Sequence, residues 1–243
     1  MTPTWILGFD TATRATAVAL AGPDETVLEA RDDPPRGERP RHVTRLLPLC
    51  AELLERAGIG FADLDRLAVG VGPGTFTGLR IGVATGRALA RAGAVPLVGI
   101  STLQSLALNA LSDPPPARTD AVAAVLDARR GEAFAAVWRT EDLARLGEPL
   151  ISAGAFTPEL LGDGLAALQV PVLALGEGAV EFRLVLERSG TVVPEDEAAL
   201  HRVTAVGHCR IARHLPAANP DQISPEYLRL PDAEIARGAK GKQ

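Results

Sequence analysis

The chain contains an internal repeat that restricts it to a duplicated α/β fold. Near its start, "WILGFDTATRATAVAL" predicts two strands, Trp5–Phe9 and Ala15–Leu20, joined by a polar turn that begins at Asp10. The segment "AVAAVLDARRGEAFAAVW" (121–138) has the same pattern, with Asp127 in the place of Asp10. In each half a strand, a glycine turn and a helix follow, at "RLAVGVGPG" and at "VPVLALGEGAVEFRLVLERSG". The repeat therefore predicts two α/β lobes, each with a mixed sheet and flanking helices.

The repeat also predicts where the lobes begin and end. We expect a first lobe over residues 1–110, a second over 117–205, a C-terminal helix and extended segment over 206–231, and a disordered tail over 232–243. The best candidate linker is "SDPPPARTD" (112–120), because three consecutive prolines cannot continue a helix.

Two helices of the first lobe can be placed from local signals. Apolar residues at helical spacing predict a helix over 43–57 that ends at Gly58, with a kink or a late start at Pro48. A further helix, "STLQSLALNAL", has Ser101 as its expected N-cap.

The composition is that of a soluble globular protein. Of 243 residues, 47% are apolar and 23% charged, and the net charge of −5 argues against a free-standing nucleic-acid binder. The start has no basic region typical of a signal peptide, and no apolar run reaches the length of a membrane span, so we expect a cytoplasmic protein. Cys50 and Cys209 lie in apolar helical contexts that predict buried free thiols.

Glycines recur every four residues in "GPGTFTGLRIGVATGRALARAG" (72–93), which otherwise predicts a helix from about Thr77. A glycine inside a helix costs roughly 0.5–1 kcal/mol relative to alanine, so a row of them needs a reason. Residues four apart lie on one face, and such a track lets another element come unusually close. It could serve to pack the helix on its own sheet or to dock a second protein. We favour docking, with the helix at 43–57 as its neighbour.

The aspartate turns indicate a nucleotide site only weakly. A strand–Asp–turn–strand unit in both lobes is typical of actin-like ATPases and sugar kinases. In these proteins the turn binds phosphate and the aspartate contacts the metal ion or its bound water. The turn "DTAT" lacks the glycine that close approach to phosphate requires, so Asp10, Thr11 and Thr13 are weak candidates for nucleotide contact. Capping of the turn, or pairing with an arginine, is the other role open to Asp10.

No motif predicts a catalytic or metal site. No two histidines are spaced i, i+4, neither cysteine belongs to a C-x-x-C pair, and G-x-S-x-G does not occur. Ser101, Ser105 and Ser152 have no triad partners that the sequence reveals. We therefore predict no catalytic residue, no cofactor and no metal.

The motifs resemble those of a known family. "ILGFDTAT", "GVGPGTFTGLRIGVATGRALA", "GISTLQSLA", "LDARRGEAFAAVW" and "PEYLRLPD" occur in this order in bacterial TsaB (YeaZ) proteins, and the resemblance runs from Ile6 to about Asp232. It implies a two-lobed actin-like (ASKHA) fold without an enzyme activity of its own. Proteins of this family support threonylcarbamoylation of adenosine 37 in tRNAs reading codons that begin with A. They do so with the catalytic relative TsaD and the ATPase TsaE, while TsaC supplies threonylcarbamoyl-AMP.

The resemblance also implies a site. The contact with TsaD, and a homodimer formed when the protein is alone, map to the helices at about 43–57 and 77–91. The residues expected at this interface are Leu46, Leu49, Leu53, Thr77, Gly78, Arg80, Ile81, Gly82, Thr85 and Gly86. tRNA is expected to be bound mainly through the complex. The competing interpretations are an actin-like ATPase or small-molecule kinase using Asp10 and Asp127, and a metallopeptidase of the glycoprotease type, which lacks its histidine pair here.

Overall fold

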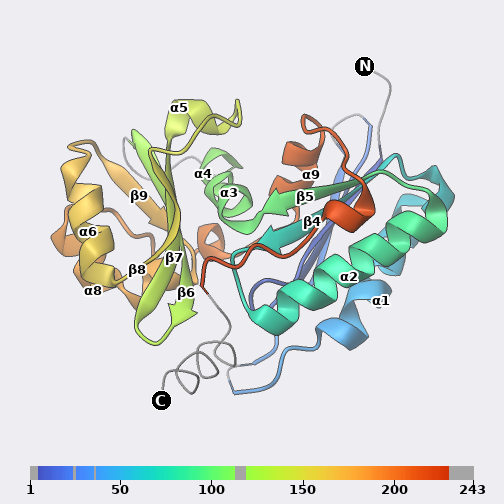
Figure 1. The fold of residues 1–243 in the computed structure, drawn as a ribbon, viewed down its shortest axis with the longest axis horizontal. Helices are drawn as coiled ribbons and strands as arrows, with labels where there is room; N and C mark the ends of the chain where they lie inside the picture. The colour runs from blue at the N-terminus through green and yellow to red at the C-terminus, as the bar shows by residue number, and fades with distance from the viewer. Residues whose placement is uncertain (1–4, 24–25, 36, 113–118, 230–243) are drawn as a thin grey trace, which may run out of the picture.

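The computed structural model describes residues 5–23, 26–35, 37–112 and 119–229. They form two β-sheets with helices between and outside them (Figure 1). The expected tail over 232–243 and most of the expected linker fall outside the described residues.

The first sheet has five strands in the order β3-β2-β1-β4-β5. β1, β2 and β3 are antiparallel neighbours, whereas β1, β4 and β5 run parallel. Their bounds are Ile6–Asp10 (β1), Thr16–Ala21 (β2), Val27–Asp32 (β3), Arg66–Gly72 (β4) and Leu97–Ser101 (β5). β1 and β2 are buried along their whole length, as expected for continuous apolar strands inside a layered fold.

The second sheet repeats this arrangement with four strands, in the order β8-β7-β6-β9. β6, β7 and β8 are antiparallel and β9 runs parallel to β6, so β6 corresponds to β1 and β9 to β4. Their bounds are Ala121–Arg129 (β6), Glu132–Arg139 (β7), Ile151–Phe156 (β8) and Val172–Leu175 (β9). The predicted fold class, with its duplicated mixed sheet, is confirmed. The third strand of each unit, β3 or β8, was not predicted.

The helices divide the molecule into layers (Figure 1). α1 (His42–Ala57) and α2 (Phe76–Gly93) cover the outer face of the first sheet. α3 (Thr102–Ala107), α4 (Asn109–Ser112) and α9 (Val206–Ala212) lie between the two sheets, in one continuous apolar cluster. α6 (Pro158–Ala167), α7 (Glu177–Glu181) and α8 (Arg183–Arg188) belong to the second sheet's outer side, and α5 (Thr140–Leu143) follows β7.

The local helix signals are largely confirmed. Gly58 ends α1 in the left-handed conformation with φ of 69°, and the Ser101 side chain accepts a hydrogen bond from the Gln104 N–H at the start of α3. Of the two alternatives expected at Pro48, a kink or a late start, the late start is wrong, because α1 begins at His42 and Pro48 lies inside it with an exposed ring. The single helix expected at the end of the segment "VPVLALGEGAVEFRLVLERSG" is divided into α7 and α8.

The C-terminal segment returns to the first sheet. α9 packs against β1, β2 and β4, and Ala218 then forms a bridge with Leu97 at the free edge of β5. The Glu226 N–H donates to the Val71 carbonyl at 2.8 Å. The described chain ends at Arg229, which pairs with Glu132 of β7 at 2.7 Å.

Candidate functional site

The glycine track of α2 faces the molecule's own first sheet. Gly78, Gly82 and Gly86 are buried, and a Cβ added at the first two would meet Thr11 in the turn after β1. The hydroxyl of Thr11 donates to the Gly78 carbonyl oxygen at 2.7 Å. The glycines therefore let α2 lie directly on the β1–β2 turn. The expectation that they form an open groove for a partner is wrong, because the chain itself fills the groove.

The leucines expected at the interface are also interior. Leu46, Leu49 and Leu53 of α1 are 2%, 2% and 0% exposed, and they belong to the core beneath the helix. The surface of α1 is formed instead by Val43, which is 75% exposed, and Leu47, which is 51% exposed. The apolar positions of this helix cover more than half of its circumference, so helical spacing alone does not distinguish the buried stripe from the exposed one.

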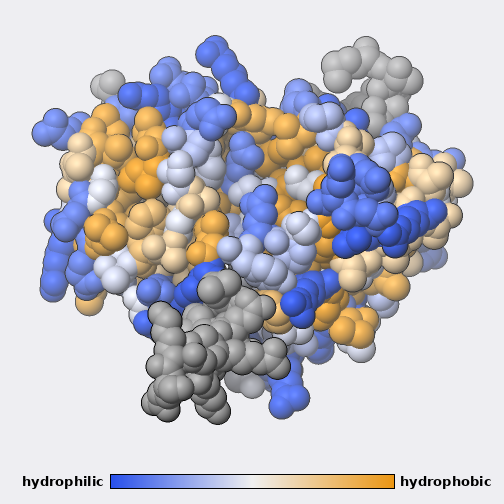
Figure 2. Space-filling view, viewed as in Figure 1, coloured by the Kyte–Doolittle hydropathy of each residue, from blue (hydrophilic) through white to orange (hydrophobic). Residues whose placement is uncertain are grey.

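An open face remains along α1 and the flank of α2 (Figure 1). Thr77, Arg80, Ile81 and Thr85, all expected at the interface, are exposed or partly exposed. We name as the α1–α2 face the apolar and small residues that share this open surface. They are Val43, Leu47 and Ala51 of α1, with Thr77, Ile81, Ala84, Thr85 and Ala88 of α2. Figure 2 shows an orange surface at this lower right part of the molecule. This role was not predicted for Val43, Leu47, Ala51, Ala84 or Ala88.

The other flank of α2 is covered by the C-terminal segment. The Arg80 guanidinium lies 3.7 Å from the centre of the Phe76 ring, and its Nε donates to the Tyr227 hydroxyl at 3.1 Å. Further along the helix, Arg87 and Arg91 both pair with Asp221. These contacts leave the flank with Thr77, Ile81 and Ala84 as the open one, which the sequence could not decide.

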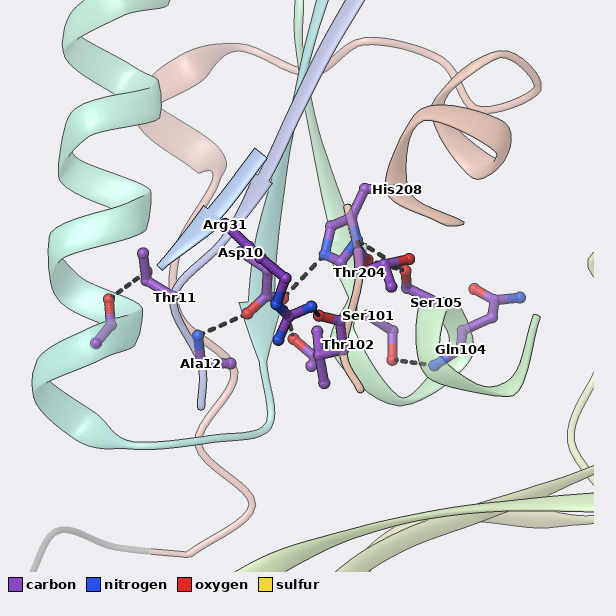
Figure 3. A network of polar contacts seen from close by, with 12 residues as sticks. Asp10, Thr11, Ala12, Arg31, Ser101, Thr102, Gln104, Ser105, Thr204 and His208 are labelled. Atoms are coloured by element: carbon purple, nitrogen blue, oxygen red, sulfur yellow. Dashed lines mark hydrogen bonds and ion pairs between the residues drawn. The ribbon is translucent and has the colours of Figure 1, made fainter. Parts of the chain in front are cut away.

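Asp10 lies in an internal network instead of the cleft between the lobes (Figure 3). Its Oδ1 accepts the Ala12 N–H at 2.6 Å, and its Oδ2 accepts from the Thr102 hydroxyl at 2.8 Å and contacts His208 Nε2 at 2.9 Å. Burial by itself raises the pKa of Asp10, but the hydrogen bonds from His208, Ala12 and Thr102 outweigh it, so the pKa is lowered. The carboxylate thus stays charged while it is enclosed by donors.

The network extends from His208 to a serine. His208 Nδ1 is 2.7 Å from the Ser105 hydroxyl, which completes a Ser–His–Asp chain that sequence reasoning missed because its members are far apart in the sequence. Ser105 and His208 are 0% exposed and Asp10 is 1% exposed. A nucleophile must reach the bond that it attacks, so this chain ties β1, α3 and α9 together and presents no hydroxyl to a substrate.

The cleft between the lobes has a volume of about 490 Å³ and a mixed charge. Of the three candidate nucleotide contacts, only Thr13 lines it, since Asp10 and Thr11 point inward. Arg14 in its wall donates to the carbonyl oxygens of Pro35 and Glu38, and Arg129 pairs with Asp127 at 2.9 Å. Arg14 and Arg129 are thus engaged by groups of the chain itself, as is Arg31, which pairs with Asp33 at 2.6 Å.

The remaining polar and thiol groups have interior roles. His42 Nδ1 is 2.9 Å from the Thr16 hydroxyl, and His201 Nδ1 accepts the Gly176 N–H at 3.1 Å. The two cysteines are buried free thiols, as predicted, and burial raises the pKa of each to about 12. Among the described residues no three His, Cys, Asp or Glu side chains are grouped to hold a metal ion, and no helix could cross a membrane.

Comparison with known proteins points to one family. The family model described as TsaD, tRNA N6-adenosine threonylcarbamoyltransferase, matches residues 34–156. The tRNA threonylcarbamoyladenosine biosynthesis protein TsaB of Escherichia coli is 34% identical over 196 residues, which are 80% of this chain and 80% of that protein. The TsaB protein of Bacillus subtilis is 27% identical over 94% of this chain and 96% of its own length.

A solved structure extends the likeness to the whole fold. YeaZ from Pseudomonas aeruginosa is 28% identical and superimposes with a TM-score of 0.72, covering 93% of this chain and 100% of that one. The chain therefore belongs to the TsaB (YeaZ) family of tRNA threonylcarbamoyladenosine biosynthesis proteins.

Proposed function

We propose that the chain is a non-catalytic subunit for threonylcarbamoylation of adenosine 37 in tRNAs reading codons that begin with A. In this proposal its α1–α2 face docks a TsaD-type catalytic subunit, and a TsaE-type ATPase joins the assembly. The observation that carries the proposal is the open apolar surface of α1, where Val43 and Leu47 are 75% and 51% exposed. Two such side chains beside the small residues of α2 make an apolar surface suited to another pair of helices.

The same face would form a homodimer when the catalytic subunit is absent. The net charge of −5 is consistent with a subunit that leaves most tRNA contacts to its partners. A supporting role, without catalysis of its own, agrees with the enclosure of Asp10 and Ser105, the two groups that most resemble catalytic residues.

The alternative function, an actin-like ATPase or small-molecule kinase, requires an acidic side chain of the first lobe beside the metal and phosphates. Asp10 is the residue that the repeat places there, but its carboxylate oxygens are occupied by Ala12, Thr102 and His208. The metallopeptidase alternative has no group of metal ligands among the described residues.

The docking proposal predicts that Leu47→Glu weakens binding of the catalytic subunit. A charge placed in the centre of an apolar contact must be desolvated, which we expect to cost about 1.4 kcal/mol or more, or tenfold in affinity. The measurement is co-purification with the TsaD-type protein of the same organism, together with mass spectrometry of threonylcarbamoyladenosine in tRNA. Sedimentation velocity of the chain alone should show the variant shifted toward monomer.

Leu184→Glu is the matched control, because Leu184 is 72% exposed on α8, which belongs to the second lobe. It should leave binding and modification unchanged. If the folded Leu47→Glu protein binds and supports modification like the wild type, docking occurs elsewhere. If purified chain modifies tRNA with threonylcarbamoyl-AMP and no catalytic subunit, the non-catalytic role is wrong.

A further inference from the structure

The two sheets have four edges, and three of them are protected within the described chain. The edge of β5 is covered by a bridge from Ala218, and the edge of β9 by a bridge from Val192 to Leu173. The third edge is β3, which contains the charged residues Glu29 and Arg31. Covering by other segments and placing charges on the strand are the usual means of keeping an edge from pairing with another chain.

β8 is the fourth edge and has neither form of protection from the residues that the structure describes. Its sequence ISAGAF contains no charged residue and no proline, and its partner among the described strands is β7 alone. Ser152, Ala153 and Ala155 are all exposed, whereas Ile151 and Phe156 pack against the core of the second sheet. The ring of Phe156 lies where a side chain of Gly154 would be, 2.9 Å from the position of its Cβ, and such aromatic cover is known to stabilise glycines in edge strands.

The chain segment that contains β8 carries charges of one sign, whereas the neighbouring strand β7 ends in the exposed Arg139. Residues 146–182 contain no Lys, Arg or His, although they include β8, α6, β9 and α7. Glu148 precedes the strand and Glu159 follows it, and both are exposed. Figure 2 shows mainly orange and pale side chains over β7 and β8, with blue nearer the rim.

We propose that the outer edge of β8 binds an extended, basic segment of a partner protein, which adds to the second sheet as a further strand. The backbone groups of this edge, which are unpaired within the described part of the chain, would supply the hydrogen bonds, and the small side chains would let the incoming backbone approach. Lysine or arginine side chains of the segment would meet Glu148 and Glu159. A second copy of this chain fits less well, since an antiparallel pair of β8 strands would bring these carboxylates together at both ends.

This inference does not rest on the docking proposal, because the α1–α2 face covers the other sheet. The probe is a blocked octapeptide in which valine alternates with lysine, and the comparison peptide has glutamate in place of lysine. Fluorescence anisotropy of the labelled peptides, titrated with the full chain, should show the glutamate peptide binding about tenfold or more weakly. Rising salt should weaken binding of the lysine peptide, as it screens exposed charges.

Two substitutions at one exposed position separate the effect of charge from that of shape. Ala153→Lys should weaken binding of the lysine peptide about fivefold or more, whereas Ala153→Glu should leave this binding unchanged or strengthen it. Val27→Lys, an exposed position on β3, should leave binding unchanged. Hydrogen exchange of the wild-type chain should show slower exchange over 151–156 when the peptide is present.

The proposal is overturned if both peptides bind alike or if both Ala153 variants bind the lysine peptide equally. It is also overturned if exchange over 151–156 does not change in the wild type, a measurement that no variant's folding can affect. Self-association of the wild type that Ala153→Lys abolishes would assign the edge to a second copy instead.

Discussion

The three buried glycines of α2 allow a graded test of how the helix packs on its own sheet. In Gly78→Ala the new methyl group falls on the backbone carbonyl oxygen of Thr11, which cannot move without shifting the β1–β2 turn. In Gly82→Ala it meets the Thr11 hydroxyl, which can rotate away if it gives up its hydrogen bond to the Gly78 carbonyl. In Gly86→Ala it lies 3.4 Å from Phe9 and Val69, an ordinary contact distance.

The expected stabilities follow from two opposing contributions. Replacing glycine by alanine inside a helix gains about 1 kcal/mol, and overpacking a core costs about 1–3 kcal/mol or more. Gly86→Ala should therefore be unchanged or stabilised by up to about 1 kcal/mol. Gly82→Ala should lower the free energy of unfolding by about 1 kcal/mol, and Gly78→Ala should lower it by about 2 kcal/mol or more. For a chain of this size each kcal/mol corresponds to about 2–4 °C in Tm.

Urea unfolding, followed by circular dichroism, measures the stability of the three variants. Their midpoint urea concentrations can be compared if the slope m of unfolding free energy against urea stays constant. Binding of the catalytic subunit by Gly86→Ala should equal that of the wild type, since this methyl group faces the core. Equal stability of all three variants would refute the packing of α2 on the β1–β2 turn. Loss of partner binding in a fully stable Gly86→Ala protein would show instead that the track is open to the partner.

The remaining predictions concern Asp10 and the thiols. The folded pKa of Asp10 lies below its ordinary value of 3.8, so its ionised form stabilises the fold above that pH and the contribution is lost as pH falls through the folded value. The difference in unfolding free energy between wild type and Asp10→Asn should therefore shrink from pH 6 to pH 3. Calorimetry with Mg–ATP should give the same result for both proteins, and micromolar binding that Asp10→Asn abolishes would favour the ATPase alternative. Because burial raises the pKa of Cys50 and Cys209 to about 12, neither should react with Ellman's reagent at pH 8 until the protein is unfolded, and fast labelling of the folded chain would contradict their burial.

The repeat was sufficient to predict the fold class and most of the central strands. β1 and β2 lie within one residue of the two segments that were predicted as strands on either side of the turn at Asp10. β3 and β8 escaped prediction for different reasons. β3 carries three charged residues in six, and β8 consists mainly of small side chains with little β-propensity. Both are edge strands, which owe their conformation to the neighbouring strand more than to their own sequence.

Some features of the candidate site also follow from local sequence, whereas others depend on the tertiary structure. The sequence by itself determined that two helices of the first lobe carry more apolar and glycine surface than one helix face needs, and that a helix with glycines every four residues must approach something closely. Only the tertiary structure decided that this neighbour is the β1–β2 turn, that Leu46, Leu49 and Leu53 point inward, and that Val43 and Leu47 remain outside. The physical reason is that spacing along a helix fixes which residues share a face, whereas the direction of that face depends on strands and turns distant in the sequence.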